Sequence, residues 1–228
     1  RSENERKSNE LEEAKKLQEQ CSDLMVKKLG VEHPDTLTSI GNLALTLKAL
    51  GDHAGAKKIE EQVVALREKH SGPEHPDTLK SIGNLSFTLR ALGEHSRAKR
   101  LQELVLNLMK KKLGLEHPDT LTSMENLALT LREMGNLADA KSLEEQGLDL
   151  RKKKLGIEHP DTLKSMSNMA SILLDLGKLI DAKNLQEQCL SLMKKHLGLE
   201  HPDTLRNMGN MAFTIKALGD YANAKNLE

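Results

Sequence analysis

Apolar residues recur along the chain at intervals of three and four positions. In one segment they are Leu37, Ile40, Leu43, Ala44, Leu47 and Leu50, and in the next they are Ala56, Ile59, Val63 and Leu66. This spacing places the apolar side chains of each segment on one face of an α-helix. The pattern therefore predicts pairs of amphipathic helices separated by short polar loops.

The predicted helix pair repeats with a constant step of 42 residues, marked by the motif His-Pro-Asp-Thr at His33, His75, His117, His159 and His201. Proline suits the first helical position because its missing N–H is not needed there, and aspartate in the first turn favours the positive end of the helix dipole. Glycines are predicted to end the helices. They are Gly30, Gly72, Gly114, Gly156 and Gly198, and Gly51, Gly93, Gly135, Gly177 and Gly219.

These marks divide the chain into repeats. We expect a polar leader or frayed cap at 1–8, a half repeat with only a second helix at 9–32, full repeats at 33–74, 75–116, 117–158 and 159–200, and a truncated repeat at 201–228. One helix pair cannot bury its apolar face alone, but a stack of pairs can. We therefore predict an all-α solenoid of antiparallel helix pairs.

The charge and the cysteine content of the chain limit the classes of function and the cellular location that we expect. The chain has 34 Lys and Arg against 34 Asp and Glu, so its formal net charge is zero. It therefore lacks the field of a dedicated nucleic-acid or membrane-surface binder, and no apolar run approaches the roughly 18 residues of a membrane span. Cys21 and Cys189 occupy the same position of two distant repeats, too far apart for a disulfide. They indicate free thiols and a reducing, cytoplasmic location.

Motifs for catalysis and metal binding are missing from the sequence. There is no nucleophile elbow, no phosphate-binding glycine loop and no histidine-glutamate zinc motif. The recurrent histidines lie two helices apart, and helices pack about 8–10 Å apart, whereas a zinc–nitrogen bond is about 2.1 Å long. We expect these histidines to cap helices and the cysteines to be buried. The prediction is a protein without catalytic activity, metal or cofactor.

The repeat pattern HPDT…NLA…L…G…AK.LEEQ.L.L..K.LG resembles the tetratricopeptide repeats of kinesin light chains, over residues 9–228. Related arrays occur in nephrocystin-like proteins and in the repeat tails of some nucleotide-binding immune-type receptors. The matching consensus positions are Leu43, Ala44, Leu47, Gly51 and Ala56. Where the consensus has aromatics, this chain mostly has Leu, Lys or His, with Tyr221 as an exception. The resemblance implies a right-handed superhelix whose first helices line a concave face that binds partner proteins.

An asparagine recurs beside the apolar stripe of every predicted first helix, at Asn42, Asn84, Asn126, Asn168 and Asn210. Asparagine is a mediocre helix former, and its amide can satisfy the backbone of an extended peptide. In the families that the chain resembles, the matching asparagine faces the groove and holds peptide backbone. The alternative is that it bonds a neighbouring repeat and fixes the spacing. The two roles can coexist.

Two further positions on the same face carry apolar and basic residues. Leu45, Phe87 and Leu129 are predicted as apolar sockets, with packing between helices as the alternative. The predicted basic groove residues are Lys48, Arg90 and Arg132, with Lys80 and Lys164 earlier on their helices. A basic groove on a neutral protein favours an acidic extended peptide or a C-terminal carboxylate. For any single lysine, a solvated helix face is the alternative.

The sequence therefore predicts a non-catalytic scaffold that binds extended, acidic protein segments, with neither nucleic acid nor membrane as a partner. One rival is a structural array that self-associates head to tail through its open ends. Another is an anionic-surface binder using the Lys-rich ends of the second helices, which the acidic residues and the missing aromatics disfavour. The near-identical repeats also fit recent duplication or a consensus-type design without a dedicated peptide ligand.

Overall fold

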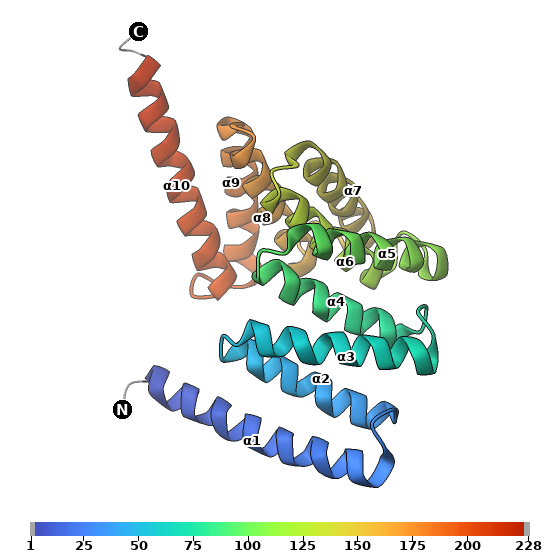
Figure 1. The fold of residues 1–228 in the computed structure, drawn as a ribbon. Helices are drawn as coiled ribbons and strands as arrows, with labels where there is room; N and C mark the ends of the chain where they lie inside the picture. Colours follow the sequence, from blue (N-terminus) through green and yellow to red (C-terminus); the bar gives the residue numbers. More distant parts are fainter. Residues whose placement is uncertain (1–2, 226–228) are drawn as a thin grey trace. The chain divides into compact units, whose positions relative to one another are not determined.

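The computed structural model describes residues 3–225, and all regular structure within that range is α-helical (Figure 1). The helices are α1 (Glu3–Leu29), α2 (Pro34–Ala49), α3 (His53–Ser71), α4 (Pro76–Ala91), α5 (His95–Leu113), α6 (Pro118–Glu133), α7 (Leu137–Leu155), α8 (Pro160–Asp175), α9 (Leu179–His196) and α10 (Pro202–Lys225). This arrangement confirms the predicted all-α fold of paired helices.

The chain forms two compact units, and the division falls inside α5, between Leu108 and Met109. In the first unit, α1 packs against α2, α2 against α3, and α3 against α4. In the second unit, α6 packs against α7, α7 against α8, α8 against α9 and α9 against α10, and α6 also touches α8. Short loops reverse the chain between consecutive helices, so neighbours are antiparallel (Figure 1). The division into repeats of 42 residues stays a prediction.

The histidine of each His-Pro-Asp-Thr motif caps a helix. In His33, His75, His117, His159 and His201, Nδ1 accepts a hydrogen bond from the backbone N–H of the aspartate two residues on, at 3.2 Å. This bond satisfies one of the backbone donors that a helix leaves free at its start. The predicted capping role is thus confirmed.

Nine of the ten predicted glycine stops have positive φ, from +72° at Gly177 to +89° at Gly30. Residues with a Cβ rarely adopt this conformation, so glycine is the natural choice there. The prediction for Gly219 is wrong, because this glycine lies inside α10. No described residue after Gly219 forms a helix that packs back on α10, and the helical hydrogen bonding continues instead.

The core of each unit is a layer of small and medium apolar side chains between successive helices. In the first unit, Ala44, Leu47 and Ala56 form one such cluster. In the second unit the cluster is Leu148, Leu163, Met166, Met169, Leu173, Ala182, Cys189 and Met193. Both cysteines are free, but Cys21 is exposed, so the prediction that it is buried is wrong. No described helix is both long and apolar enough to cross a membrane.

Candidate functional site

The predicted groove residues of the first unit gather around an exposed aromatic ring. Lys48 Nζ from α2 and the Arg90 guanidinium from α4 lie 5.5 and 5.1 Å from the centre of the Phe87 ring, which is 49% exposed. Both distances allow cation–π attraction. Lys48 also forms an ion pair with the buried Glu60, at 2.8 Å. Leu45 on α2 is exposed too.

The predicted groove residues of the second unit lie on α6, α8 and α10. Leu129 is half-buried, and Arg132 Nε donates to Asp175 Oδ2 at 2.5 Å, which links α6 to α8. Asn168 Nδ2 donates to Glu125 Oε1 at 3.1 Å and makes a second such link. At Asn168, therefore, the recurrent asparagine bonds a neighbouring repeat.

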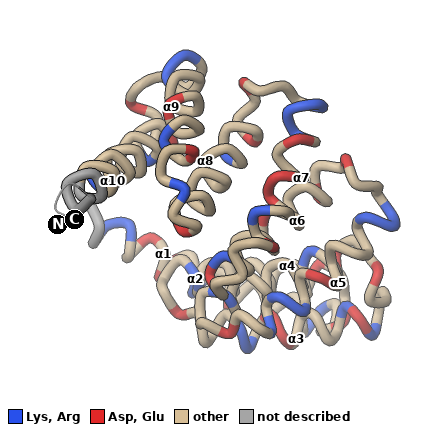
Figure 2. The backbone as a smooth tube through the Cα atoms, turned by 90° about the horizontal axis from the view of Figure 1, so that it is seen from above, with Lys and Arg blue, Asp and Glu red and all other residues tan. Residues whose placement is uncertain are grey.

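The other recurrent asparagines differ in their exposure. Asn84, Asn126 and Asn210 are half-buried, whereas Asn42 is exposed. Lys80 on α4 is exposed as well. Charges of both signs are interspersed along the helices of each unit rather than gathered on one element (Figure 2). Several predicted groove cations pair with acids of the chain, namely Lys48 with Glu60, Arg132 with Asp175, and Lys164 with Glu125.

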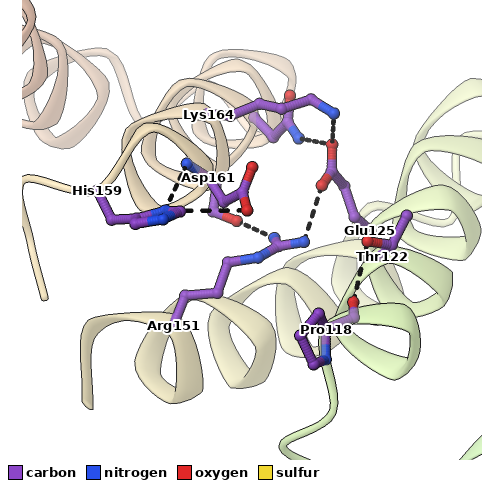
Figure 3. A network of polar contacts seen from close by, with 9 residues as sticks. Pro118, Thr122, Glu125, Arg151, His159, Asp161 and Lys164 are labelled. Atoms are coloured by element: carbon purple, nitrogen blue, oxygen red, sulfur yellow. Dashed lines mark hydrogen bonds and ion pairs between the residues drawn. The ribbon is translucent and has the colours of Figure 1, made fainter. Parts of the chain in front are cut away.

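A buried polar network centres on Glu125 of α6 (Figure 3). Lys164 Nζ and Asn168 Nδ2, both from α8, contact its Oε1 at 2.8 and 3.1 Å. Arg151 Nη2, from α7, donates to Oε2 at 3.0 Å, and Arg151 Nη1 donates to Ser165 Oγ. The side chains of Glu125 and Arg151 are only 3% and 5% exposed. Three helices thus meet around one carboxylate.

A second carboxyl, Glu144 of α7, lies in the same buried region. Burial raises its pKa from 4.5 to about 7, and the negative charge of Glu125 acts in the same direction. The positive charges of Arg151 and Lys164 oppose the shift without cancelling it. Glu144 therefore changes its protonation state near neutral pH.

The first unit has a buried arginine at the equivalent position of α3. Arg67 Nη1 donates to the backbone oxygen of Asp77 at 2.8 Å and to Ser81 Oγ at 3.0 Å. Its Nη2 donates to Thr38 Oγ1 at 3.0 Å. Arg67 is 9% exposed. These three partners are neutral groups, in contrast to the carboxylate that Arg151 meets.

A pocket of about 330 Å³ lies in the second unit, between α8 and α10 and beside the end of α9. Its polar lining includes Lys164, Ser167, Asn168, Asp203, Arg206, Asn207 and Asn210, and Arg206 pairs with Asp203 at 3.1 Å. Asn207 is buried, and its Nδ2 donates to Ser167 Oγ at 3.1 Å. Its Oδ1 has no hydrogen-bond partner in the part of the chain that the structure describes. The pocket thus gathers amide groups and two cations, each of which has an acidic partner within the chain.

Sequence reasoning missed the buried polar residues of the second helices, although the sequence carries a signal for them. Two positions of the second helix, seven residues apart, change together from one repeat to the next. They hold glutamine and methionine in one repeat and glutamate and arginine in the following one. The pairs are Gln18 and Met25, Glu60 and Arg67, Gln102 and Met109, Glu144 and Arg151, and Gln186 and Met193. Because the charges change together, the alternation indicates that they share an environment. Within the described residues, no three His, Cys, Asp or Glu side chains gather as a metal site requires.

Family models of the tetratricopeptide repeat match most of the chain. One model matches residues 77–153, and a second matches residues 4–35, 36–77 and 162–203. A comparison with curated protein sequences found no match.

Three solved structures have the same fold. Two are of a Podosopora anserina putative kinesin light chain with nearly identical TPR-like repeats, and one of these two is a point variant. The point variant is 33% identical, with a TM-score of 0.75 and coverage of 83% of this chain and 89% of that one. The other form is 33% identical, with a TM-score of 0.72 and coverage of 86% and 92%. BtubC (BKLC) from P. vanneervenii has a TM-score of 0.70 and coverage of 99% and 88%, but at 17% identity it shows the shared fold alone.

Proposed function

Because this chain belongs to the tetratricopeptide-repeat family, we propose that it is a non-catalytic scaffold whose first helices bind extended, acidic segments of partner proteins. Repeats of this family typically serve protein–protein interaction. A cytoplasmic location belongs to the same proposal and is supported by the two free cysteines.

The observation that carries the proposal is the pocket between α8 and α10. It brings Arg206 together with three residues that the sequence predicted for ligand binding, namely Asn210 and the Glu125-bound Lys164 and Asn168. Amide groups satisfy a peptide backbone, and cations attract acidic side chains. The exposed Phe87 ring, flanked by two cations, supports the proposal in the first unit because it offers an apolar contact beside positive charge.

The proposal is tested by selecting binders from a random-peptide display library on the wild type and on the double variant Arg206→Ala, Asn210→Ala. We expect acidic peptides to enrich on the wild type and to be lost on the double variant. Lys183→Ala is the matched control, because it also removes one cation of a local ion pair, with Glu187 on α9. The proposal is wrong if no peptide enriches, or if the enriched peptides bind the double variant as well as the wild type.

Self-association is a second candidate, favoured by exposed apolar side chains on α1 and α10. On α1, Leu17 and Leu24 are about as exposed as Leu205 and Phe213 are on α10. Such patches commonly mark protein contacts. Light scattering over a range of concentrations tests this candidate: a mass that rises with concentration and falls for Leu17→Glu, Leu24→Glu supports it, and a constant monomer mass excludes it.

A further inference from the structure

Glu125 occupies a repeat position that otherwise carries no acid. The equivalent residues in the other repeats are Gly41, Gly83, Ser167 and Gly209. Glutamate at this position extends a carboxylate toward α7 and α8, where it becomes almost fully buried (Figure 3). Burying a carboxylate costs free energy unless cations and hydrogen-bond donors surround it. The groups around Glu125 therefore show how this site binds a carboxylate.

The donors around Glu125 are those that an acidic ligand would need. Lys164 and Asn168 were both predicted as ligand-binding residues, and both contact Oε1 of Glu125. Arg151 adds a charge-assisted hydrogen bond to Oε2. The two oxygens therefore have three donors from two helices, which is a complete binding site for one carboxylate.

We propose that the carboxylate of Glu125 occupies the site between α6 and α8 and thereby prevents an acidic ligand from binding there. This inference rests on the proposed function, in which the repeats bind acidic residues of a partner protein. It adds that Glu125 determines which of the repeats can do so. The site of Arg151, Lys164 and Asn168 has its carboxylate supplied from within the chain. A partner's acidic residue must therefore bind elsewhere.

The pocket between α8 and α10 is the equivalent place one repeat further along, and it supports the proposal. The residues equivalent to Glu125, Lys164 and Asn168 are Ser167, Arg206 and Asn210, and all three line the pocket. The short Ser167 side chain carries no charge and leaves a volume of about 330 Å³ between the helices. The two places thus share a basic residue and an asparagine one turn apart, and they differ at the position of Glu125. They also differ in that Met193 stands in place of Arg151, and Arg206 pairs with Asp203, another residue of the pocket lining, at 3.1 Å.

Removing the internal carboxylate should create a site that a small carboxylate from solution can fill. In Glu125→Ala, the buried Arg151 loses its anionic partner, and we expect the melting temperature to fall by roughly 10 °C. Sodium acetate should raise the melting temperature of this variant by several degrees more than sodium chloride at the same ionic strength, because a ligand that binds only the folded state stabilises it. Wild type should respond to the two salts equally.

Glu145→Ala is the matched control, because it removes an exposed glutamate of α7 that pairs with Lys141. It should show neither the lower melting temperature nor the preference for acetate. Nuclear magnetic resonance gives a local measurement: acetate should shift the side-chain amide resonances of Asn168 in Glu125→Ala and leave them unchanged in wild type. Equal effects of acetate and chloride on the variant, with no shift at Asn168, would overturn the proposal.

The reverse variant tests the inference even if Glu125→Ala does not fold. Ser167→Glu places a carboxylate beside Arg206 and Asn210, and Ser167→Gln is the control of equal size without charge. We expect Ser167→Glu, unlike Ser167→Gln, to shift the Asn210 side-chain amide and to prevent the shift that a capped glutamate tripeptide causes there in wild type. Identical spectra for both variants would contradict the proposal. Neither acetate nor this tripeptide depends on the display selection, so a failed selection would remove the proposed function while these results still decide the role of Glu125.

Discussion

Arg67 in the first unit and Arg151 in the second are equivalent residues, 84 positions apart, in two different environments. Arg67 is satisfied by a backbone oxygen and two hydroxyl groups. Arg151 has a hydroxyl and a buried carboxylate as partners. The same helix position thus accommodates a buried cation in two ways, with neutral acceptors or with an opposite charge.

The other repeats show that the cation is not required for the fold. Methionine stands at the equivalent positions Met25, Met109 and Met193, and in the second unit Met193 belongs to the apolar core. Replacing a buried ion pair by well-packed apolar residues is often neutral, whereas removing one partner alone is costly. We therefore expect the two polar networks to contribute similarly to the stability of the fold. They differ in the unpaired group that remains when the arginine is removed: a buried carboxylate beside Arg151, and neutral acceptors beside Arg67.

The largest expected effect comes from replacing each arginine by the methionine of the neighbouring repeats. Arg151→Met removes the buried one of the two cations that pair with Glu125, and we expect a loss of about 4 kcal/mol in the free energy of unfolding. Arg67→Met leaves only neutral acceptors unpaired, so the loss should be about 1–2 kcal/mol. Denaturant unfolding followed by circular dichroism measures both. Adding Glu125→Gln to Arg151→Met should recover much of the loss, and equal losses for the two arginine variants would contradict the comparison.

The next effect is a dependence of stability on pH around neutrality, which arises from Glu144 in the second unit. The pKa of Glu144, about 7, lies above the ordinary value of 4.5, so the folded protein holds this proton more tightly than the unfolded chain. Its contribution to stability is present below about pH 4.5 and is lost as the pH rises through 7, a change of about 3 kcal/mol. Glu144→Gln, which copies Gln102 and Gln186, should remove this dependence and raise stability at about pH 8 by a similar amount.

Unfolding of the wild type and of Glu144→Gln at several pH values measures this effect. Glu145→Gln, on the exposed surface of the same helix, is the control and should leave the pH profile unchanged. Parallel profiles for wild type and Glu144→Gln would show that burial of this carboxyl does not cost stability.

A smaller effect is expected from giving Arg67 the carboxylate that Arg151 has. Gly41 is equivalent to Glu125, and a Cβ added there meets no atom within 4 Å. Gly41→Glu and Gly41→Gln should both gain about 0.5–1 kcal/mol from better helix propensity. Gly41→Glu should gain about 1 kcal/mol more from pairing with Arg67 and Lys80. Equal stability of the two variants would show that the first unit does not position a carboxylate as the second unit does.

The smallest effect separates two recurrent asparagines. Asn42 is exposed, so Asn42→Ala should raise stability by a few tenths of a kcal/mol through helix propensity. Asn168 donates to the buried Glu125, so Asn168→Ala should lower stability by about 1 kcal/mol. Thermal unfolding compares the two variants. Similar changes in both would mean that the bond from Asn168 contributes nothing and that the asparagines act alike.

Much of the fold could be predicted because its signals are local and repeated. His33 and its equivalents cap helices through a contact only two residues away, and Gly30 and its equivalents end helices through their own backbone conformation. Gly219 shows the limit of this reasoning. Its local sequence matches the other stops, yet Gly219 lies inside α10.

The candidate site could be predicted only in part. The sequence pointed to Lys164, Asn168 and Asn210 because the repeat aligns them on one helix face, but it did not show that Lys164 pairs with Glu125. That contact joins residues 39 positions apart on different helices. The partners of a side chain across an interface depend on its length and its rotamer, and no spacing rule describes either.

The sequence by itself determined the repeat, the order of the helices and the side chains that each repeat offers, because these follow from periodicity, capping and turn chemistry within a few residues. The tertiary structure decided which of these side chains already have a partner within the chain. Glu125 fills one site from within, Ser167 leaves the next one hollow, and the two arginines find different acceptors. Burial is the physical reason: a charge removed from water must take its partners from whichever helices pack around it.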